Sequence, residues 1–484
     1  MIEDAPQPTS STKRMAVAIA LLSGISLGGC AMLPETGPLK SVKTSEQYES
    51  AASFSAPAGN WPAENWWQSY GDPQLVTLVE EALHDAPDIA AVAARMRRAE
   101  AFMKVSRSAL MPQVSANASI AEQKLSYNYL TPRNMTPDGW QDYGQGTINL
   151  NWELDFWGKN RAGLAAASSE LEARRAEAAL VRLNIASAIA TNYSELARLH
   201  ALRDTVTRTV EIRKKTVELF AERFANGLET QGSVSEARAR LAAANGELLS
   251  IEEQIGLTKN RLAALVGAGP DRALSIKRPT VNLAGTFSLP AQLSVDLLGR
   301  RPDVIVARLM AKAQAHRIDQ KKAEFYPNVN LSAFIGVQSL GLNMLTKSGS
   351  DIGGIGPAVS LPIFTAGRLQ GELREKVAAY DEMVANYDAT VAHALEDVAG
   401  TALSMKALAA QLEQGKEAVA EAAEAHRVAR NRYEGGLANF IEVLYAEDLL
   451  LNNQRVLTAL QSRAFTLDVA LQRALGGGYQ HKNI

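Results

Sequence analysis

This chain of 484 residues has little cysteine, few aromatic residues and no excess of charge of either sign. A single cysteine, Cys30, excludes an intrachain disulfide. Because 50 basic residues stand against 52 acidic ones, the composition gives no indication of nucleic-acid binding. After residue 30, no apolar run reaches the roughly 20 residues that a membrane-spanning helix needs. If the mature chain crosses a membrane, we expect it to do so as a β-barrel. Aromatic residues are only 6% of the chain and alanine is abundant, which favours long helices.

The N-terminal residues have the order of a secretory signal. The basic pair Lys13 and Arg14 precedes a short apolar run that ends in small residues, which predicts a signal peptide over residues 1–29. The following sequence LGGC, which ends at Cys30, resembles the lipobox of bacterial lipoproteins, in which the cysteine is lipidated and becomes the mature N-terminus. Ala31 replaces the aspartate that retains such proteins in the inner membrane, which favours the outer membrane. An ordinary signal peptide with a coincidental cysteine is the alternative.

The two halves of the chain repeat one another at low similarity. Four motifs recur 207 to 215 positions later: PD at 87 and 302, PQV and PNV at 112 and 327, LDF and LPIF at 154 and 361, and RFANGL and RYEGGL at 223 and 432. Loop insertions produce such small changes of offset. We therefore expect an internal two-fold repeat, each half running helix, two strands, long helix, tight turn, helix.

Alternation of apolar and other residues predicts four strands, two in each half. The apolar positions are Val114, Ala116, Ala118 and Ile120; Ile148, Leu150, Trp152, Leu154 and Phe156; Val329, Leu331, Ala333, Ile335 and Val337; and Ile355, Val359, Leu361 and Ile363. The pattern alone fits both a half-buried sheet of a soluble protein and a barrel between lipid and water. Strands of about ten residues match a bilayer crossing. Since four strands cannot close an open barrel, several copies would have to pool them.

Long uninterrupted helices are expected from residue 158 to 224 and from 367 to 433, each roughly 100 Å long. Each is followed by a returning helix. Apolar residues recur along the first pair at spacings of three, four and seven: Ile189, Tyr193, Leu196, Leu199, Val206, Val210, Val217, Phe220 and Phe224, then Leu241, Leu248, Ile251, Ile255, Leu262 and Leu265. This spacing predicts coiled-coil-like packing in an elongated protein.

Four motifs resemble, in their order and spacing, the TolC-like family of outer-membrane efflux factors, in its lipoprotein (NodT-type) branch. They are WWQSYGDPQL from Trp66, LLGRRPD from Leu297, FYP from Phe325 and ALGGG from Ala474. The similarity covers Cys30 to Tyr479. It implies a mainly α-helical protein with a membrane β-barrel, in which three protomers pool four strands each into one twelve-stranded barrel. The helices would continue as a hollow, antiparallel α-barrel across the periplasm.

The resemblance also implies how the chain divides. The expected segments are a signal peptide, 1–29; a lipidated N-terminal segment, 30–70; α-barrel helices of the first repeat, 71–112 and 158–270, around outer-membrane strands, 113–157; an equatorial link, 271–290; α-barrel helices of the second repeat, 291–326 and 366–475, around strands, 327–365; and a tail, 476–484.

The implied function is that of a passive exit duct. The chain would be a homotrimer in outer-membrane lipid, working with a periplasmic adaptor (membrane fusion) protein and an inner-membrane RND-type transporter, with no cofactor, metal or nucleic acid. A structural coiled coil that is anchored but does not span leaves the four strands unexplained. An enzyme lacks any nucleophile–base pair or ligand cluster in this sequence, because the six histidines are scattered.

The turns between the long helices carry the first candidate site. In the family these tips meet the adaptor, which implies contact through Arg223, Gly227, Arg432, Gly435 and Gly436. The glycines fit left-handed positions that end a helix, so a good turn without further function is the alternative.

The pore constriction is expected just after the second tip. Ile441 matches the family's apolar position, but Tyr445 stands where an acid is usual and Asp448 where a base is usual. We therefore expect a constriction made by Ile441 and Tyr445, with Asp448, Glu442 or Glu447 making the mouth acidic and favouring cations. The alternative is that these residues pack between helices.

Overall fold

The computed structural model describes residues 34–35, 37–44, 47–49, 53–54, 58–128, 132–281, 289–290 and 293–481. The expected signal peptide and the lipidation site Cys30 lie outside the described residues. The chain divides into two compact units. The first is built mainly from residues 97–172 and 308–385, and the second from 42–96, 173–307 and 386–484.

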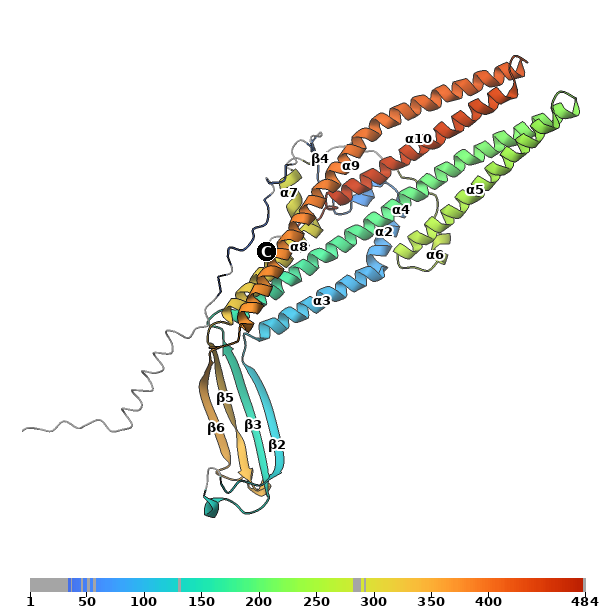
Figure 1. Ribbon diagram of the computed structural model, residues 1–484. Helices are drawn as coiled ribbons and strands as arrows, with labels where there is room; N and C mark the ends of the chain where they lie inside the picture. Colours follow the sequence, from blue (N-terminus) through green and yellow to red (C-terminus); the bar gives the residue numbers. More distant parts are fainter. Residues whose placement is uncertain are drawn as a thin grey trace, which may run out of the picture. The chain divides into compact units, whose positions relative to one another are not determined.

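The first unit contains a four-stranded antiparallel sheet together with the adjoining ends of four helices (Figure 1). Its strands are β2 (Gln113–Gln123), β3 (Gln141–Leu154), β5 (Asn328–Leu340) and β6 (Asp351–Ser360), in the order β2-β3-β5-β6. The register sets Ile148 of β3 beside Ala116 on one side and Ile335 on the other. The apolar positions of neighbouring strands therefore share one face, as the alternation predicted.

Large apolar side chains on that face are exposed. Six of them have more than half of their surface accessible: Val114, Ile120, Ile148, Ile335, Ile355 and Val359. A sheet in a water-soluble core would bury such residues, so this face is suited to an apolar environment.

Two strands end earlier than the alternation predicted, at Leu154 and Ser360, so that Phe156, Leu361 and Ile363 lie outside them. The Asp155 carboxylate accepts hydrogen bonds from the backbone N–H groups of Asn160, at 3.1 Å, and Arg161, at 2.9 Å. It thereby starts the next helix in place of extending the strand. At the other end, Pro362 has no N–H to contribute to a ladder.

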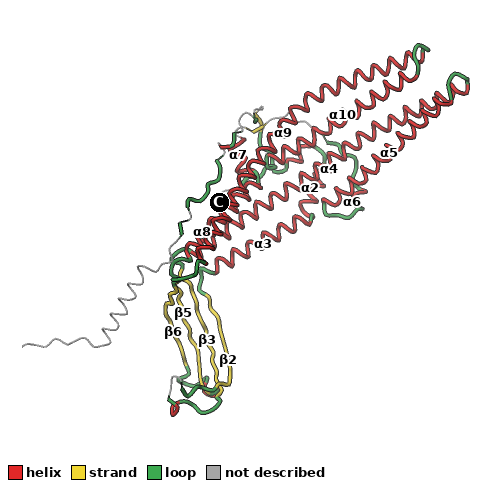
Figure 2. The backbone as a smooth tube through the Cα atoms, viewed as in Figure 1, coloured by secondary structure: helices red, strands yellow, loops and turns green. Residues whose placement is uncertain are grey.

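Four long helices follow the strands in two antiparallel pairs (Figures 1 and 2): α4 (Lys159–Ala225) with α5 (Gln231–Leu265), and α9 (Arg368–Glu434) with α10 (Phe440–Ala474). The first member of each pair has 67 residues and the second has 35. Most of the predicted stripe on α4 and α5 is buried: Ile189, Tyr193, Leu196, Leu199, Val206, Phe220, Ile251, Ile255 and Leu262. Phe224, by contrast, is 43% exposed at the tip. Among the described residues, no helix combines the length and the apolar character of a membrane span.

Shorter elements complete the chain. They are β1 (Ala58–Gly59), η2 (Trp66–Tyr70), α2 (Pro73–Asp85), α3 (Pro87–Ser108), η3 (Arg133–Met135), α6 (Asp271–Leu274), β4 (Leu289–Pro290), α7 (Leu293–Arg300), α8 (Pro302–Ala323) and η4 (Leu342–Met344). β1 and β4 pair in parallel.

Two of the sequence motifs hold the second unit together. Asp72 is buried at the start of α2, where it accepts hydrogen bonds from the Tyr193 hydroxyl at 2.8 Å and the Thr280 N–H at 2.7 Å. Burial alone would raise the pKa of Asp72, but these hydrogen bonds lower it overall. Arg301 pairs with Asp303 at 2.6 Å and with Asp397 at 2.9 Å. Both motifs therefore have a structural role that joins distant segments.

Candidate functional site: the helix tips and the start of α10

The two tips have the same backbone conformation. Gly227 and Gly436 are left-handed, with φ of 72° and 73°. The N–H of Leu228 donates to the carbonyl of Arg223, and that of Leu437 to the carbonyl of Arg432, each at 2.8 Å. These are the bonds of a Schellman ending, which only glycine accommodates without strain.

Gly435 differs from the expectation of a left-handed residue. Its φ is not positive, and its N–H donates to the carbonyl of Asn431 at 3.0 Å. Gly435 thus continues the helical hydrogen bonding of α9, and the left-handed conformation falls on Gly436 alone.

An aromatic cluster joins the two helix pairs near their tips. The rings of Phe220 on α4 and Phe440 on α10 meet edge to face at a centroid distance of 4.2 Å. Tyr433 on α9 lies 5.2 Å from Phe440. The Arg223 guanidinium stacks over the Tyr433 ring at 5.0 Å. One candidate adaptor residue, Arg223, is therefore also part of the contact between the pairs.

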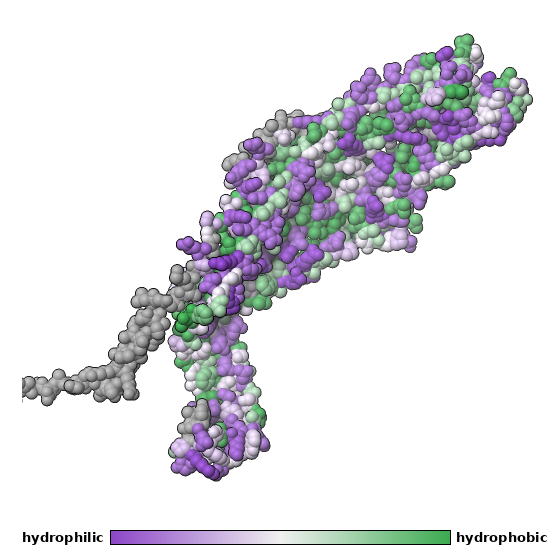
Figure 3. Space-filling view, in the orientation of Figure 1, coloured by the Kyte–Doolittle hydropathy of each residue, from purple (hydrophilic) through white to green (hydrophobic). Residues whose placement is uncertain are grey.

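The second candidate arginine bridges its own turn. Arg432 donates to Glu442 at 3.2 Å and to the carbonyl of Leu437 at 3.4 Å. Leu228 and Leu437 are 66% and 76% exposed at the two tips, where Figure 3 shows hydrophobic side chains among hydrophilic ones. Exposed apolar side chains at a tip are suited to contact with another protein.

The predicted constriction residues lie on the open face of α10. Ile441 is 57% exposed and Tyr445 is 75% exposed, and Leu449, one turn further on, is 52% exposed. Their spacing of four places them in one row along the helix. Val443 and Leu444, which lie off this row, are buried.

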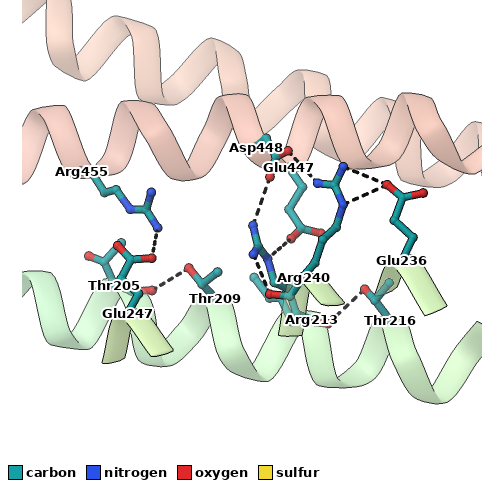
Figure 4. A network of polar contacts seen from close by, with 11 residues as sticks. Thr205, Thr209, Arg213, Thr216, Glu236, Arg240, Glu247, Glu447, Asp448 and Arg455 are labelled. Atoms are coloured by element: carbon teal, nitrogen blue, oxygen red, sulfur yellow. Dashed lines mark hydrogen bonds and ion pairs between the residues drawn. The ribbon is translucent and has the colours of Figure 1, made fainter. Parts of the chain in front are cut away.

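Asp448 is held by two arginines from the neighbouring pair (Figure 4). Arg213 of α4 donates to one carboxylate oxygen at 3.2 Å, and Arg240 of α5 donates to the other at 2.8 Å. Arg240 also bonds to Glu236 at 3.1 Å, and Arg213 donates to the backbone carbonyl of Arg240 at 2.9 Å. This network links α10 to both helices of the other pair.

Glu447 is the buried member of the network. Its residue surface is only 3% exposed, and a carboxylate oxygen lies 3.6 Å from Nε of Arg213. Burial raises the pKa of Glu447, although the Arg213 charge opposes the shift. Arg213 and Arg240 were not predicted from the sequence, because no local signal shows that residues more than 200 positions before Asp448 would reach it.

Comparison with known proteins identifies the class. The chain resembles solved outer-membrane proteins along most of its length. It superposes on the outer membrane protein VceC of Vibrio cholerae with a TM-score of 0.83 and 48% identity, covering 87% of this chain and 100% of that one. The fold is also that of the Campylobacter jejuni CmeC outer membrane channel, at a TM-score of 0.83 and 22% identity, over 94% of this chain and 96% of that one.

The sequence profile of the outer membrane efflux protein family matches residues 78–268 and 293–477. Multidrug resistance outer membrane protein MdtP of Escherichia coli is 30% identical over 96% of this chain and 97% of its own length. Fusaric acid resistance protein FusA of Burkholderia cepacia is 35% identical over 76% of this chain and 70% of its own length. The chain belongs to the outer membrane efflux protein family, which is a family of efflux proteins and not of enzymes, and its place is the outer membrane.

Proposed function

We propose that three copies of this chain form the exit duct of a tripartite efflux pump, with one twelve-stranded β-barrel in the outer membrane. The sheet supports this assembly, because β2 and β6 each keep one edge unpaired among the described residues. Unpaired edges in lipid must be closed by pairing with another copy. The exposed apolar face would contact lipid and the other face would line the duct.

The helices would continue the duct into the periplasm, anchored by lipidation at Cys30. Their tips, with Arg223, Gly227, Arg432, Gly435 and Gly436, would meet a periplasmic adaptor that connects the duct to an RND-type transporter. The function requires no cofactor. The two-fold repeat that the motifs predict is supported by the equal lengths of the two helix pairs.

The start of α10 would close the periplasmic end. The observation that carries this proposal is the row of Ile441 and Tyr445, large side chains left exposed on one face while Asp448 on another face is bonded to the neighbouring pair. Opening would swing α9 and α10 outward and break the bonds of Asp448 and Glu447. Adaptor binding must therefore favour the open state through contacts that the closed state lacks. Glu442 at the mouth, paired with Arg432, would add negative charge once that pair opens.

The test is permeability after removal of the two large side chains. We expect Ile441→Ala with Tyr445→Ala to raise single-channel conductance and to admit vancomycin into cells. Leu249→Ala, at a position 67% exposed on α5, is the matched control and should change neither. Unchanged permeability in the double variant would remove these residues from the gate.

Assembly is tested separately by single-particle imaging of the detergent-extracted protein. We expect a threefold hollow tube whose helical section is about 100 Å long. A solid rod without a lumen would favour a structural coiled coil.

A further inference from the structure

The polar face of the sheet is almost free of charge. Most of its side chains are amides, hydroxyls and small groups, which are Gln113, Ser115, Asn117, Ser119, Ala121 and Gln123; Gln141, Tyr143, Gln145, Thr147, Asn149 and Asn151; Asn328, Asn330, Ser332 and Gln338; and Gly354, Gly356, Ala358 and Ser360. Two aliphatic residues, Leu340 and Ile352, lie toward its loop end. Among the described strand residues, one charged side chain, Glu153, shares this face. It lies at the helix end and is paired with Lys159 at 2.5 Å.

Phe334 is the exception in the middle of this face. The register sets it between Asn149 of β3 and Gly354 of β6, and the residue is 42% exposed. The amide side chains around it offer the ring no apolar surface to pack against, so the ring remains partly exposed.

The neighbouring strand is shaped around this ring. A Cβ atom added to Gly354 would lie 2.9 Å from Cε1 of Phe334, closer than side-chain contacts allow. Further along the same face, Gly356 and Ala358 carry almost no side chain. The ring therefore lies over the bare backbone of β6 and is the largest side chain over that part of the face.

On the duct proposed above, which places this face toward the lumen, we propose that Phe334 sets the size limit of the strand section. Three copies of the ring, one from each protomer, would narrow an otherwise wide and uncharged passage. Because charge is nearly absent there, the passage would discriminate by width and by apolar contact with the ring faces and not by the sign of charge. The cargo it suits is amphipathic, with a planar apolar part thin enough to pass the rings.

Cysteine labelling tests this in the full-length protein in native outer membranes. Asn330→Cys lies on the helix side of Phe334, about 13 Å deeper along β5, and Gln338→Cys lies on the loop side. Each is treated from outside with small charged methanethiosulfonate reagents and with polyethylene glycol maleimides of increasing mass. The wild-type chain, whose only cysteine is Cys30, gives the baseline.

We expect both cysteines to react with the small reagent. The large reagents should reach Gln338→Cys but react several-fold more slowly at Asn330→Cys. Phe334→Ala should restore the rate at Asn330→Cys and leave the rate at Gln338→Cys unchanged, which also reports that the barrel has formed. Phe334→Ser, which matches the neighbouring Ser332 on this face, should act in the same way.

Two contrary outcomes are distinguishable. If large reagents reach Asn330→Cys equally well with and without the ring, Phe334 does not limit the passage, while the duct stands. If neither Asn330→Cys nor Gln338→Cys reacts with the small reagent, while Ile335→Cys on the other face does, the polar face does not line a lumen and the proposed duct itself fails.

Discussion

The two helix tips have the same backbone conformation, but the helices that return from them carry different side chains. Both turns place a left-handed glycine at the same point and close with the same hydrogen bonds. In both, the returning helix is then capped by a side chain: Thr230 accepts from the N–H of Ser233, and Asn439 from that of Glu442, each at 3.2 Å. The turn is therefore a generic way to reverse two long helices.

The difference lies in the first two turns of each returning helix. Val234 and Val443, 209 positions apart (234 to 443), are both buried. By the same offset, however, Ile441 and Tyr445 of α10 replace Gly232 and Glu236 of α5. The backbone and the buried valine are thus alike in both pairs, whereas large apolar side chains are exposed at these positions on the second pair only. Any gating at this end must be carried by side chains and their contacts.

The largest effect on stability should come from the ion pair of Arg213 with Glu447, which joins the second helix pair to the first. Arg213→Met removes the arginine that is ion-paired with the buried Glu447, which costs about 3 kcal/mol. Hydrogen exchange of the α10 amides around Glu447 should accelerate roughly hundredfold, since each 1.4 kcal/mol is a factor of ten. Conductance should rise with it if this contact holds the duct closed.

Arg455→Met is the matched control for Arg213. Arg455 also joins the pairs, through Glu247 at 2.6 Å, but both side chains are about one-third exposed. Its loss should cost less than about 1 kcal/mol. Equal acceleration in the two variants would show that burial of Glu447 does not distinguish these contacts.

A second difference, between a buried histidine and an exposed one, concerns pH. His200 on α4 is 5% exposed, and neither ring nitrogen has a hydrogen-bond partner among the residues that the structure describes. Burial, aided by the charges of Arg203 and Lys259, lowers the pKa of His200 to about 4. In the unfolded chain His200 therefore takes up a proton near pH 6.5, whereas in the folded chain it stays neutral until the pH approaches 4. The contribution of His200 to the free energy of unfolding is present above pH 6.5 and is lost as the pH falls toward 4.

His200→Gln should remove this acid sensitivity. At pH 5 the loss attributed to His200 is about 2 kcal/mol relative to pH 7, and the melting temperature should fall less on acidification in the variant than in the parent. The control is His393→Gln on α9, a histidine whose side chain is 77% exposed, so that the comparison isolates the effect of burial. An identical pH profile for His200→Gln and the parent would contradict the assignment.

The sequence was sufficient wherever a local pattern determines the structure. Period-two alternation located the four strands of the larger sheet, though not the two-residue strands β1 and β4, and the absence of proline located α4 and α9 to within a residue or two. Glycine in RFANGL indicated the left-handed Gly227, although in RYEGGL the sequence could not choose between Gly435 and Gly436. The alternation placed the end of β3 too late, because the Asp155 side chain accepts hydrogen bonds from the first turn of the next helix and ends the strand before it.

Contacts between distant segments could not be predicted in this way. Nothing near Asp448 in the sequence shows that Arg213 and Arg240 bind it, because three helices must pack before those charges meet. For the same reason, Phe334 was not singled out among the residues of its strand. Its significance comes from the register that sets it over Gly354.

The smallest expected effect tests whether the two turns are energetically alike. Around Gly227 and Gly436 there is free space for a Cβ atom, so alanine at either position incurs only the backbone cost of a left-handed residue, about 1 kcal/mol. Gly227→Ala and Gly436→Ala should therefore lower the local stability of their turns equally, measured by hydrogen exchange at Leu228 and Leu437. Gly435→Ala, where φ is not positive, should be neutral or slightly stabilising. If Gly436→Ala alone raised conductance while both turns loosened equally, the turn would be generic and the gate specific to the second pair; unequal loosening would mean that the shared backbone conceals a difference in strain.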